Sequence, residues 1–117
     1  MPDKILYSNI LQDFAHPLLN EKDTDEIFMT KMKIVEVIWN YCIAKEFKLP
    51  VFDELNKIIT SQNKIHSAMK AVFDEFIKYK ETDFGEYKNF IQKVEYRINS
   101  KGAKTLYVES VDPKHLQ

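Results

Sequence analysis

The sequence predicts an all-α protein: a compact bundle of four to five helices around one central apolar helix, followed by an extended C-terminal arm. Three observations support this fold class. Apolar residues recur at helical spacing through most of the chain. The 2 glycines and 4 prolines are too few for the closely spaced turns of an all-β protein. A length of 117 residues, 44% of them hydrophobic, suits one domain with its own core.

The central helix is expected at about residues 24–47. Within residues 32–44, apolar side chains surround most of the helix at about 100° per residue, and the polar exceptions are Lys33, Glu36 and Asn40. A helix with this pattern must be covered by other elements on several sides. Charged residues interrupt it too often for a membrane span of about 20 apolar residues, so we expect no membrane partner.

The surrounding helices are predicted from apolar stripes and from residues that favour helix ends. Pro17 disfavours helical geometry at the residue before it, so the first helix should end near residue 15. Asp23 and Glu26 have capping-box spacing before the central helix, and Asp83 and Glu86 have it before the last one. These helices are expected at residues 4–15, 50–61, 64–80 and 84–101.

Residues 50–80 contain the most regular apolar stripe, and two interpretations of it are open. The heptad phase is unbroken, which favours one helix. One continuous helix would be about 46 Å long at 1.5 Å per residue, and residues 60–63 are poor in helix formers. We therefore expect a bend or break at residues 61–63.

The last part of the chain differs in character. We expect a helical domain at residues 1–102 and an extended, partly mobile arm at residues 103–117. Residues 105–109 have the composition of a strand, and Pro113 would stop a helix. Three arrangements of this segment are open: packing along the bundle, pairing with a second copy of the chain, or adding to a partner's sheet.

No catalytic, metal-binding or cofactor-binding residue is predicted. The single cysteine excludes an intramolecular disulfide and a multi-thiolate metal site, and Cys42 lies on an apolar helix face. The GxSxG, HExxH and glycine-rich phosphate-binding motifs are absent. A formal charge of −1 gives no general attraction to nucleic acid or to anionic membranes. The first residues lack the pattern of a secretion signal, so we expect a cytoplasmic protein.

The first candidate site is a polar pocket on the central helix, formed by Lys33, Glu36, Asn40 and His66. If His66 faces Glu36, the carboxylate and the imidazole would share a proton and shift each other's pKa. The alternative is an ion pair between Lys33 and Glu36 at a solvent-exposed edge, with His66 as a hydrogen-bonded core or rim residue.

The second candidate site is an interaction surface on the last helix and the arm. Lys93, Arg97 and Lys101 follow at i, i+4 and i+8, with Tyr96 nearby, a pattern that can contact phosphates and bases. A solvated helix face is the ordinary explanation of the same pattern. The full surface comprises Asn89, Lys93, Tyr96, Arg97, Lys101, Leu106, Tyr107 and Val108.

The leading functional hypothesis is a small cytoplasmic, non-catalytic module for protein–protein interaction or regulation. It includes self-association as a homodimer through the 50–80 stripe or the arm. One alternative is a nucleic-acid-associated regulator that uses Lys93, Tyr96, Arg97 and Lys101. The other is a ligand-binding or enzymatic bundle with the polar pocket as its site.

Overall fold

The computed structural model describes residues 7–65, 67–98, 100–102 and 104–116, and it corrects the predicted fold class. The all-α prediction is wrong, because the chain is mixed α/β: an antiparallel two-stranded sheet packs against the helices. The elements, in chain order, are α1 (Tyr7–Ala15), η1 (His16–Leu18), α2 (Asp25–Phe47), α3 (Phe52–Ile65), α4 (Ser67–Asp83), β1 (Phe90–Ile98), β2 (Lys104–Val111) and η2 (Pro113–Leu116), where η denotes a short 3-10 helix.

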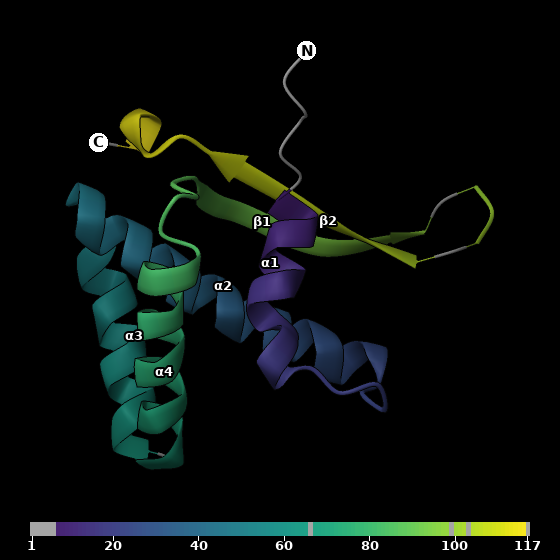
Figure 1. Cartoon of the computed structure of the whole chain (residues 1–117), viewed down its shortest axis with the longest axis horizontal. Coiled ribbons are helices and arrows are strands. Elements are labelled where there is room, and N and C mark those ends of the chain that lie inside the picture. The colour runs from purple at the N-terminus through teal and green to yellow at the C-terminus, as the bar shows by residue number, and fades with distance from the viewer. Residues whose placement is uncertain (1–6, 66, 99, 103, 117) are drawn as a thin grey trace.

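The arrangement is organised around α2 (Figure 1). This helix crosses the molecule, the α3–α4 pair descends from its C-terminal end, and the β1–β2 hairpin runs across the top. Contacts from α1, α3, α4 and β1 all reach α2. Val35, Ile38, Trp39 and Ile43 are completely buried along it, so the predicted central helix is confirmed. No described helix combines the length and the apolar character that crossing a membrane requires.

The helix ends follow local chemistry, with one correction. The first helix ends at Ala15, as the position of Pro17 predicted. The N-cap of α2 is Thr24 and not Asp23: the Thr24 hydroxyl accepts the Ile27 N–H at 3.2 Å. Asp23 instead forms an ion pair with Lys31 at 2.8 Å, which ties the loop before α2 to the helix.

The 50–80 stripe forms two helices, as predicted, but the break comes after Ile65 rather than at residues 61–63. The two helices fold back on each other and on α2. Their apolar stripes are therefore buried at Leu55, Ile59, Phe73 and Phe76.

The predicted helix at residues 84–101 is wrong, because residues 90–98 form β1. A bulge between Ile91 and Lys93 inserts one residue into this strand. Ile91 and Val94 are consequently both buried although they are three residues apart, a spacing that imitates a helix. β2 is the partner of β1 in the same chain, with Val94 opposite Val108. The domain boundary expected after residue 102 falls in the turn between the two strands.

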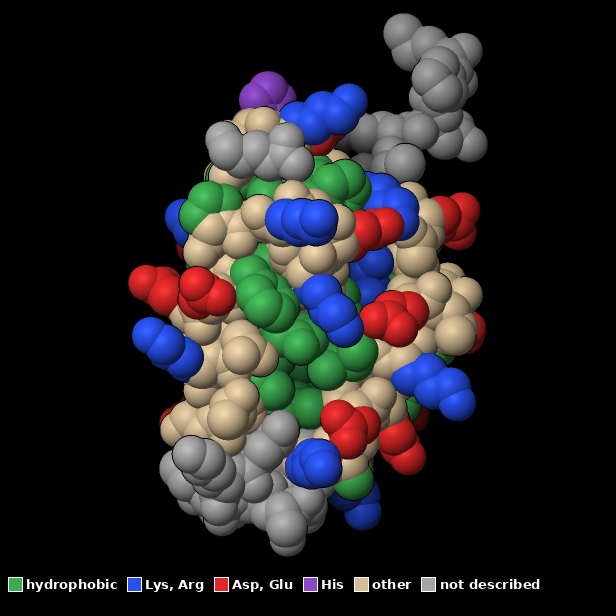
Figure 2. Space-filling view, turned by 90° about the vertical axis from the view of Figure 1, so that its left-hand side faces the viewer, with side chains coloured by type: hydrophobic (Ala, Val, Ile, Leu, Met, Phe, Trp, Pro, Cys, Tyr) green, Lys and Arg blue, Asp and Glu red, His purple; other side chains and the backbone are tan. Residues whose placement is uncertain are grey.

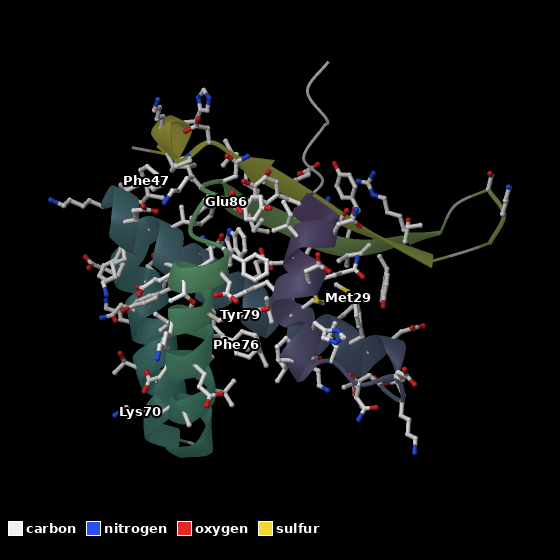
Figure 3. All side chains as sticks on the ribbon, viewed as in Figure 1. Met29, Phe47, Lys70, Phe76, Tyr79 and Glu86 are labelled. Carbon is white, nitrogen blue, oxygen red and sulfur yellow. The ribbon has the colours of Figure 1, made fainter. Side chains whose placement is uncertain are left out.

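An aromatic cluster connects α1, α2 and α4. The Phe14 ring is completely buried, with its centroid 5.4 Å from those of Trp39 and Phe76 and 5.5 Å from that of Tyr79. Figure 3 shows Phe76 and Tyr79 projecting from α4 toward α1. Edge-to-face and stacked rings of this kind add about 0.5–1.5 kcal/mol per pair beyond their buried area. The cluster fixes α1 against α2 and α4.

Candidate functional site

The connection from α4 to β1 is held by buried polar side chains. Lys80 is 2% exposed, and its Nζ donates to the carbonyl oxygens of Phe84 at 2.8 Å and Tyr87 at 3.0 Å. The same ammonium lies 4.4 Å from the Trp39 ring centroid, and the Trp39 Nε1 donates to the Asn89 carbonyl at 2.9 Å. Burial disfavours the charged form and lowers the pKa of Lys80. These side chains hold main chain in place, which is a structural role.

Asn40 is another buried polar side chain that binds main chain, here at the start of β1. Its Nδ2 donates to the Ile91 carbonyl at 2.7 Å, and its Oδ1 accepts the Ile91 N–H at 2.7 Å. Both residues are buried, with Asn40 at 5% exposure and Ile91 at 1%. The carboxamide thus gives β1 the two hydrogen bonds that a neighbouring strand would otherwise supply. Asn40 is therefore bound to the hairpin and is not part of an open polar pocket.

The other members of the predicted polar pocket lie elsewhere. Lys33 and Glu36 form an ion pair at 3.7 Å, and the Lys33 side chain is 55% exposed, which agrees with the solvent-edge alternative. Burial raises the pKa of Glu36, and Lys33 partly opposes that shift. His66 lies outside the described residues, so the shared proton stays an untested prediction. Within the described part of the chain, no three histidine, cysteine, aspartate or glutamate side chains gather to hold a metal ion.

A cavity of about 420 Å³ lies beside Cys42, between α2, α4 and the start of the following loop. Cys42 is 8% exposed, and burial raises the pKa of its thiol to about 12. The thiol is consequently protonated at neutral pH, whereas a reactive cysteine needs a thiolate. Across the cavity mouth, Lys88 and Glu46 form an ion pair at 2.6 Å. Lys80 also lines the cavity, and its Nζ is hydrogen-bonded to the Phe84 and Tyr87 carbonyl oxygens.

The predicted interaction surface is divided by the hairpin. Lys93 and Arg97 lie on the outer face of the sheet, where Glu95 pairs with both, at 3.5 Å and 2.9 Å respectively. The Arg97 guanidinium lies 3.3 Å from the centroid of the Tyr107 ring, on the same face. Tyr96, by contrast, faces the helices and stacks on Phe28 of α2, with the ring centroids 5.3 Å apart. Tyr96, which the nucleic-acid hypothesis places beside Lys93 and Arg97, therefore lies on the other side of the sheet from them.

The remaining members of that surface also separate. Asn89 belongs to the α4–β1 connection, where its N–H donates to the Tyr7 hydroxyl at 3.2 Å and its Nδ2 donates to Ser110 Oγ at 3.1 Å. Lys101 is exposed in the turn of the hairpin. Leu106 and Val108 lie opposite Tyr96 and Val94 on the helix-facing side of the sheet and pack against the core.

Tyr96 and Leu106 line a cavity of about 510 Å³ that we name the α1–hairpin groove. Sequence reasoning missed its α1 wall, because polar residues on one side of an amphipathic helix give no signal of a site. The seven lining residues that the structure describes are all uncharged, whereas 30% of the whole chain is charged. The lining residues are Ser8, Asn9 and Gln12 of α1, Phe28 of α2, Tyr96 of β1, and Thr105 and Leu106 of β2.

A second surface is visible on the side where α3 and the C-terminal end of α2 lie. Figure 2 shows hydrophobic side chains gathered in the middle of this face, framed by lysine, aspartate and glutamate. On α3 itself, Ile58 is 46% exposed. Apolar surface framed by polar side chains is typical of protein contact sites.

The chain matches no protein-family model, no curated protein and no solved structure, so its site is interpreted from its own residues.

Proposed function

We propose that this chain is a small, cytoplasmic, non-catalytic module that binds a partner protein through the α1–hairpin groove and serves an interaction or regulatory role. The observation that supports this proposal is the chemistry of the groove. It combines half-exposed aromatic rings with uncharged hydrogen-bonding side chains on elements fixed by the core. Such a mixture of aromatic and adaptable polar groups is typical of protein-binding surfaces.

The state of the buried polar groups supports a role without catalysis. Lys80, Trp39 and Asn40 are all engaged with main-chain atoms of the same chain. The thiol of Cys42 is protonated at neutral pH because its pKa is raised to about 12. A catalytic acid, base or nucleophile needs a reactive atom free to meet a substrate, whereas Lys80 and Asn40 are hydrogen-bonded to main chain and the Cys42 thiol is protonated.

Self-association through the 50–80 stripe and the nucleic-acid alternative have less support. Self-association through the 50–80 stripe would be limited to its exposed part, such as Ile58, since Leu55 and Phe73 are buried within the chain. Nucleic-acid binding would need Tyr96 beside Lys93 and Arg97, but Tyr96 stacks on Phe28 on the other side of the sheet. We therefore carry forward only the protein-binding proposal.

Affinity capture with three forms of the full chain tests this proposal. The forms are the wild type, the double variant Asn9→Lys/Gln12→Lys, and Asp13→Lys as control. Asp13 is exposed on the same helix and does not line the groove, and both changes add two positive charges. The proposal expects a protein that the wild type and the control retain, that the double variant loses, and that binds the purified wild type directly. Capture of the same proteins by all three forms, or of none, would contradict it.

A further inference from the structure

We infer that the α1–hairpin groove binds an uncharged, extended peptide segment of the partner protein. The carboxamides of Asn9 and Gln12 form hydrogen bonds with the main chain of that segment. This inference rests on the proposed function and adds the kind of ligand. Three features of the groove lead to it: hydrogen-bonding groups without partners, a carboxamide spacing that matches an extended chain, and an apolar floor without charge.

The hydrogen-bonding groups in the groove are available. In the described part of the chain, the side chains of Ser8, Asn9 and Gln12 and the Tyr96 hydroxyl have no hydrogen-bond partner. Thr105 is different, since its hydroxyl bonds to the Arg97 carbonyl at 3.2 Å. Each free carboxamide offers both a donor and an acceptor, which is the complement of one peptide unit.

This protein already uses a carboxamide on a helix in this way. Asn40 binds both the N–H and the C=O of Ile91 at 2.7 Å, with the residue in an extended strand. Asn9 and Gln12 are three positions apart on α1, so their Cβ atoms are about 5–6 Å apart. Main-chain groups on the same side of an extended peptide recur about every 6.6–6.8 Å, twice the rise per residue. The two spacings are similar, and the flexible side chains of Asn9 and Gln12 can make up the difference. Both carboxamides can therefore form hydrogen bonds with one extended segment.

The floor of the groove determines which side chains the segment can have. Phe28 and Tyr96 stack with their ring planes 21° apart, and Leu106 lies beside them. Alternate side chains of an extended peptide point to one side, so those facing the floor would be apolar. Among the lining residues that the structure describes, none is a lysine, arginine, aspartate or glutamate. A charged segment or a phosphate would lose hydration there without gaining an opposite charge from any of the described lining residues.

A peptide selection followed by backbone methylation tests the inference. A displayed library of random peptides is selected on the immobilised full chain, and the selected peptides are measured by fluorescence anisotropy. We expect uncharged sequences with alternating apolar residues. The variant Asn9→Ala/Gln12→Ala should weaken binding about tenfold, equal to about 1.4 kcal/mol. The control Asp13→Ala should bind within about twofold of the wild type, because an exposed side chain outside the site contributes little.

N-methylation examines main-chain recognition itself, since it removes one N–H and leaves every side chain in place. We expect methylation at one or two alternate positions to weaken binding about tenfold. Methylation removes a peptide N–H, so the carboxamide oxygen of Asn9 or Gln12 loses the donor that it would accept from. Selection of no peptide, equal binding by the double variant, or indifference to methylation would each overturn the inference. So would groove-dependent binding of an oligonucleotide, or a dimer that the groove variants abolish. If the capture experiment still gives a groove-dependent partner while peptides fail, the proposed function stands and the extended-peptide assignment is wrong.

Discussion

Asn40→Ala should detach the start of the hairpin from the central helix. The substitution removes two hydrogen bonds of 2.7 Å to Ile91 and leaves its main-chain N–H and C=O buried without partners. Each such hydrogen bond contributes about 0.5–1.5 kcal/mol, and a buried unsatisfied group costs about 1–3 kcal/mol. We expect the free energy of unfolding to fall by about 2–4 kcal/mol, from a total of about 5–15 kcal/mol for an ordinary domain. The melting temperature should fall by about 8–16 °C, at about 4 °C per kcal/mol.

Urea unfolding followed by the fluorescence of Trp39, the single tryptophan, measures this change. Hydrogen exchange of the Ile91 amide gives a local measurement, because that N–H donates to Asn40 in the wild type and should exchange faster in the variant. Asn56→Ala is the control, since Asn56 is exposed on α3, and we expect a change within about 0.5 kcal/mol. A loss below about 1 kcal/mol for Asn40→Ala, with the Ile91 amide still protected, would refute the role of Asn40.

Four further predictions concern three buried or half-buried ionisable groups, Lys80, Cys42 and Glu36. Lys80→Met removes the hydrogen-bond donors to the Phe84 and Tyr87 carbonyls and should lower the free energy of unfolding by about 1–3 kcal/mol in urea titrations. A higher free energy of unfolding would show that the cost of burying the ammonium exceeds the contribution of its hydrogen bonds. The Cys42 thiol should react with iodoacetamide at pH 8 at least about tenfold more slowly in the native chain than in urea, since only the thiolate reacts. The pKa of the Cys42 thiol is raised from 9.0 to about 12, so its contribution to the free energy of unfolding is complete below pH 9 and is lost as the pH rises toward 12. A Cys42→Ala variant that loses the same stability at alkaline pH as the wild type would contradict this. Burial raises the pKa of Glu36 above 4.5, so its stabilising contribution is complete below that pH and is lost as the pH rises. The stability of Glu36→Gln relative to the wild type should therefore increase between pH 4 and pH 7. If the difference between the urea midpoints of the two proteins stays the same over this range, that effect is excluded.

The helical part of the fold could be predicted because its signals are local. The all-round apolarity of residues 32–44 required a covered helix, and Pro17 determined the end of α1. The N-cap of α2 was predicted one residue too early, because Asp23 and Thr24 are both residues that favour this position. In the structure the Thr24 hydroxyl accepts the hydrogen bond from the main-chain N–H of Ile27.

The hairpin was missed because a strand depends on a partner distant in the sequence. The bulge between Ile91 and Lys93 gave the buried residues of β1 a helix-like spacing. One signal did point to a strand: Val94, Tyr96 and Ile98 alternate with charged residues, as half-buried strands do. Recognising β2 as the partner required Gly102 to be read as a turn residue. It has a φ of 78°, in the turn between the two strands.

The candidate sites could be predicted only in part, for the same reason. Asn40 stood out as a polar residue on an apolar helix, but its partner, Ile91, is 51 positions away. Tyr96 and Leu106 were both named as contact residues and do line one groove. Their shared site with Asn9 and Gln12 depends on how α1 packs against the hairpin, which no local pattern encodes.

The most direct test of the central claim compares peptide affinity between three forms of the full chain. Fluorescence anisotropy with one selected, uncharged peptide gives the dissociation constants of the wild type, Asn9→Ala/Gln12→Ala and Asp13→Ala. We predict about tenfold weaker binding for the double variant only, since it alone removes the carboxamides that line the groove. Equal dissociation constants for all three forms would show that the α1–hairpin groove is not the binding site.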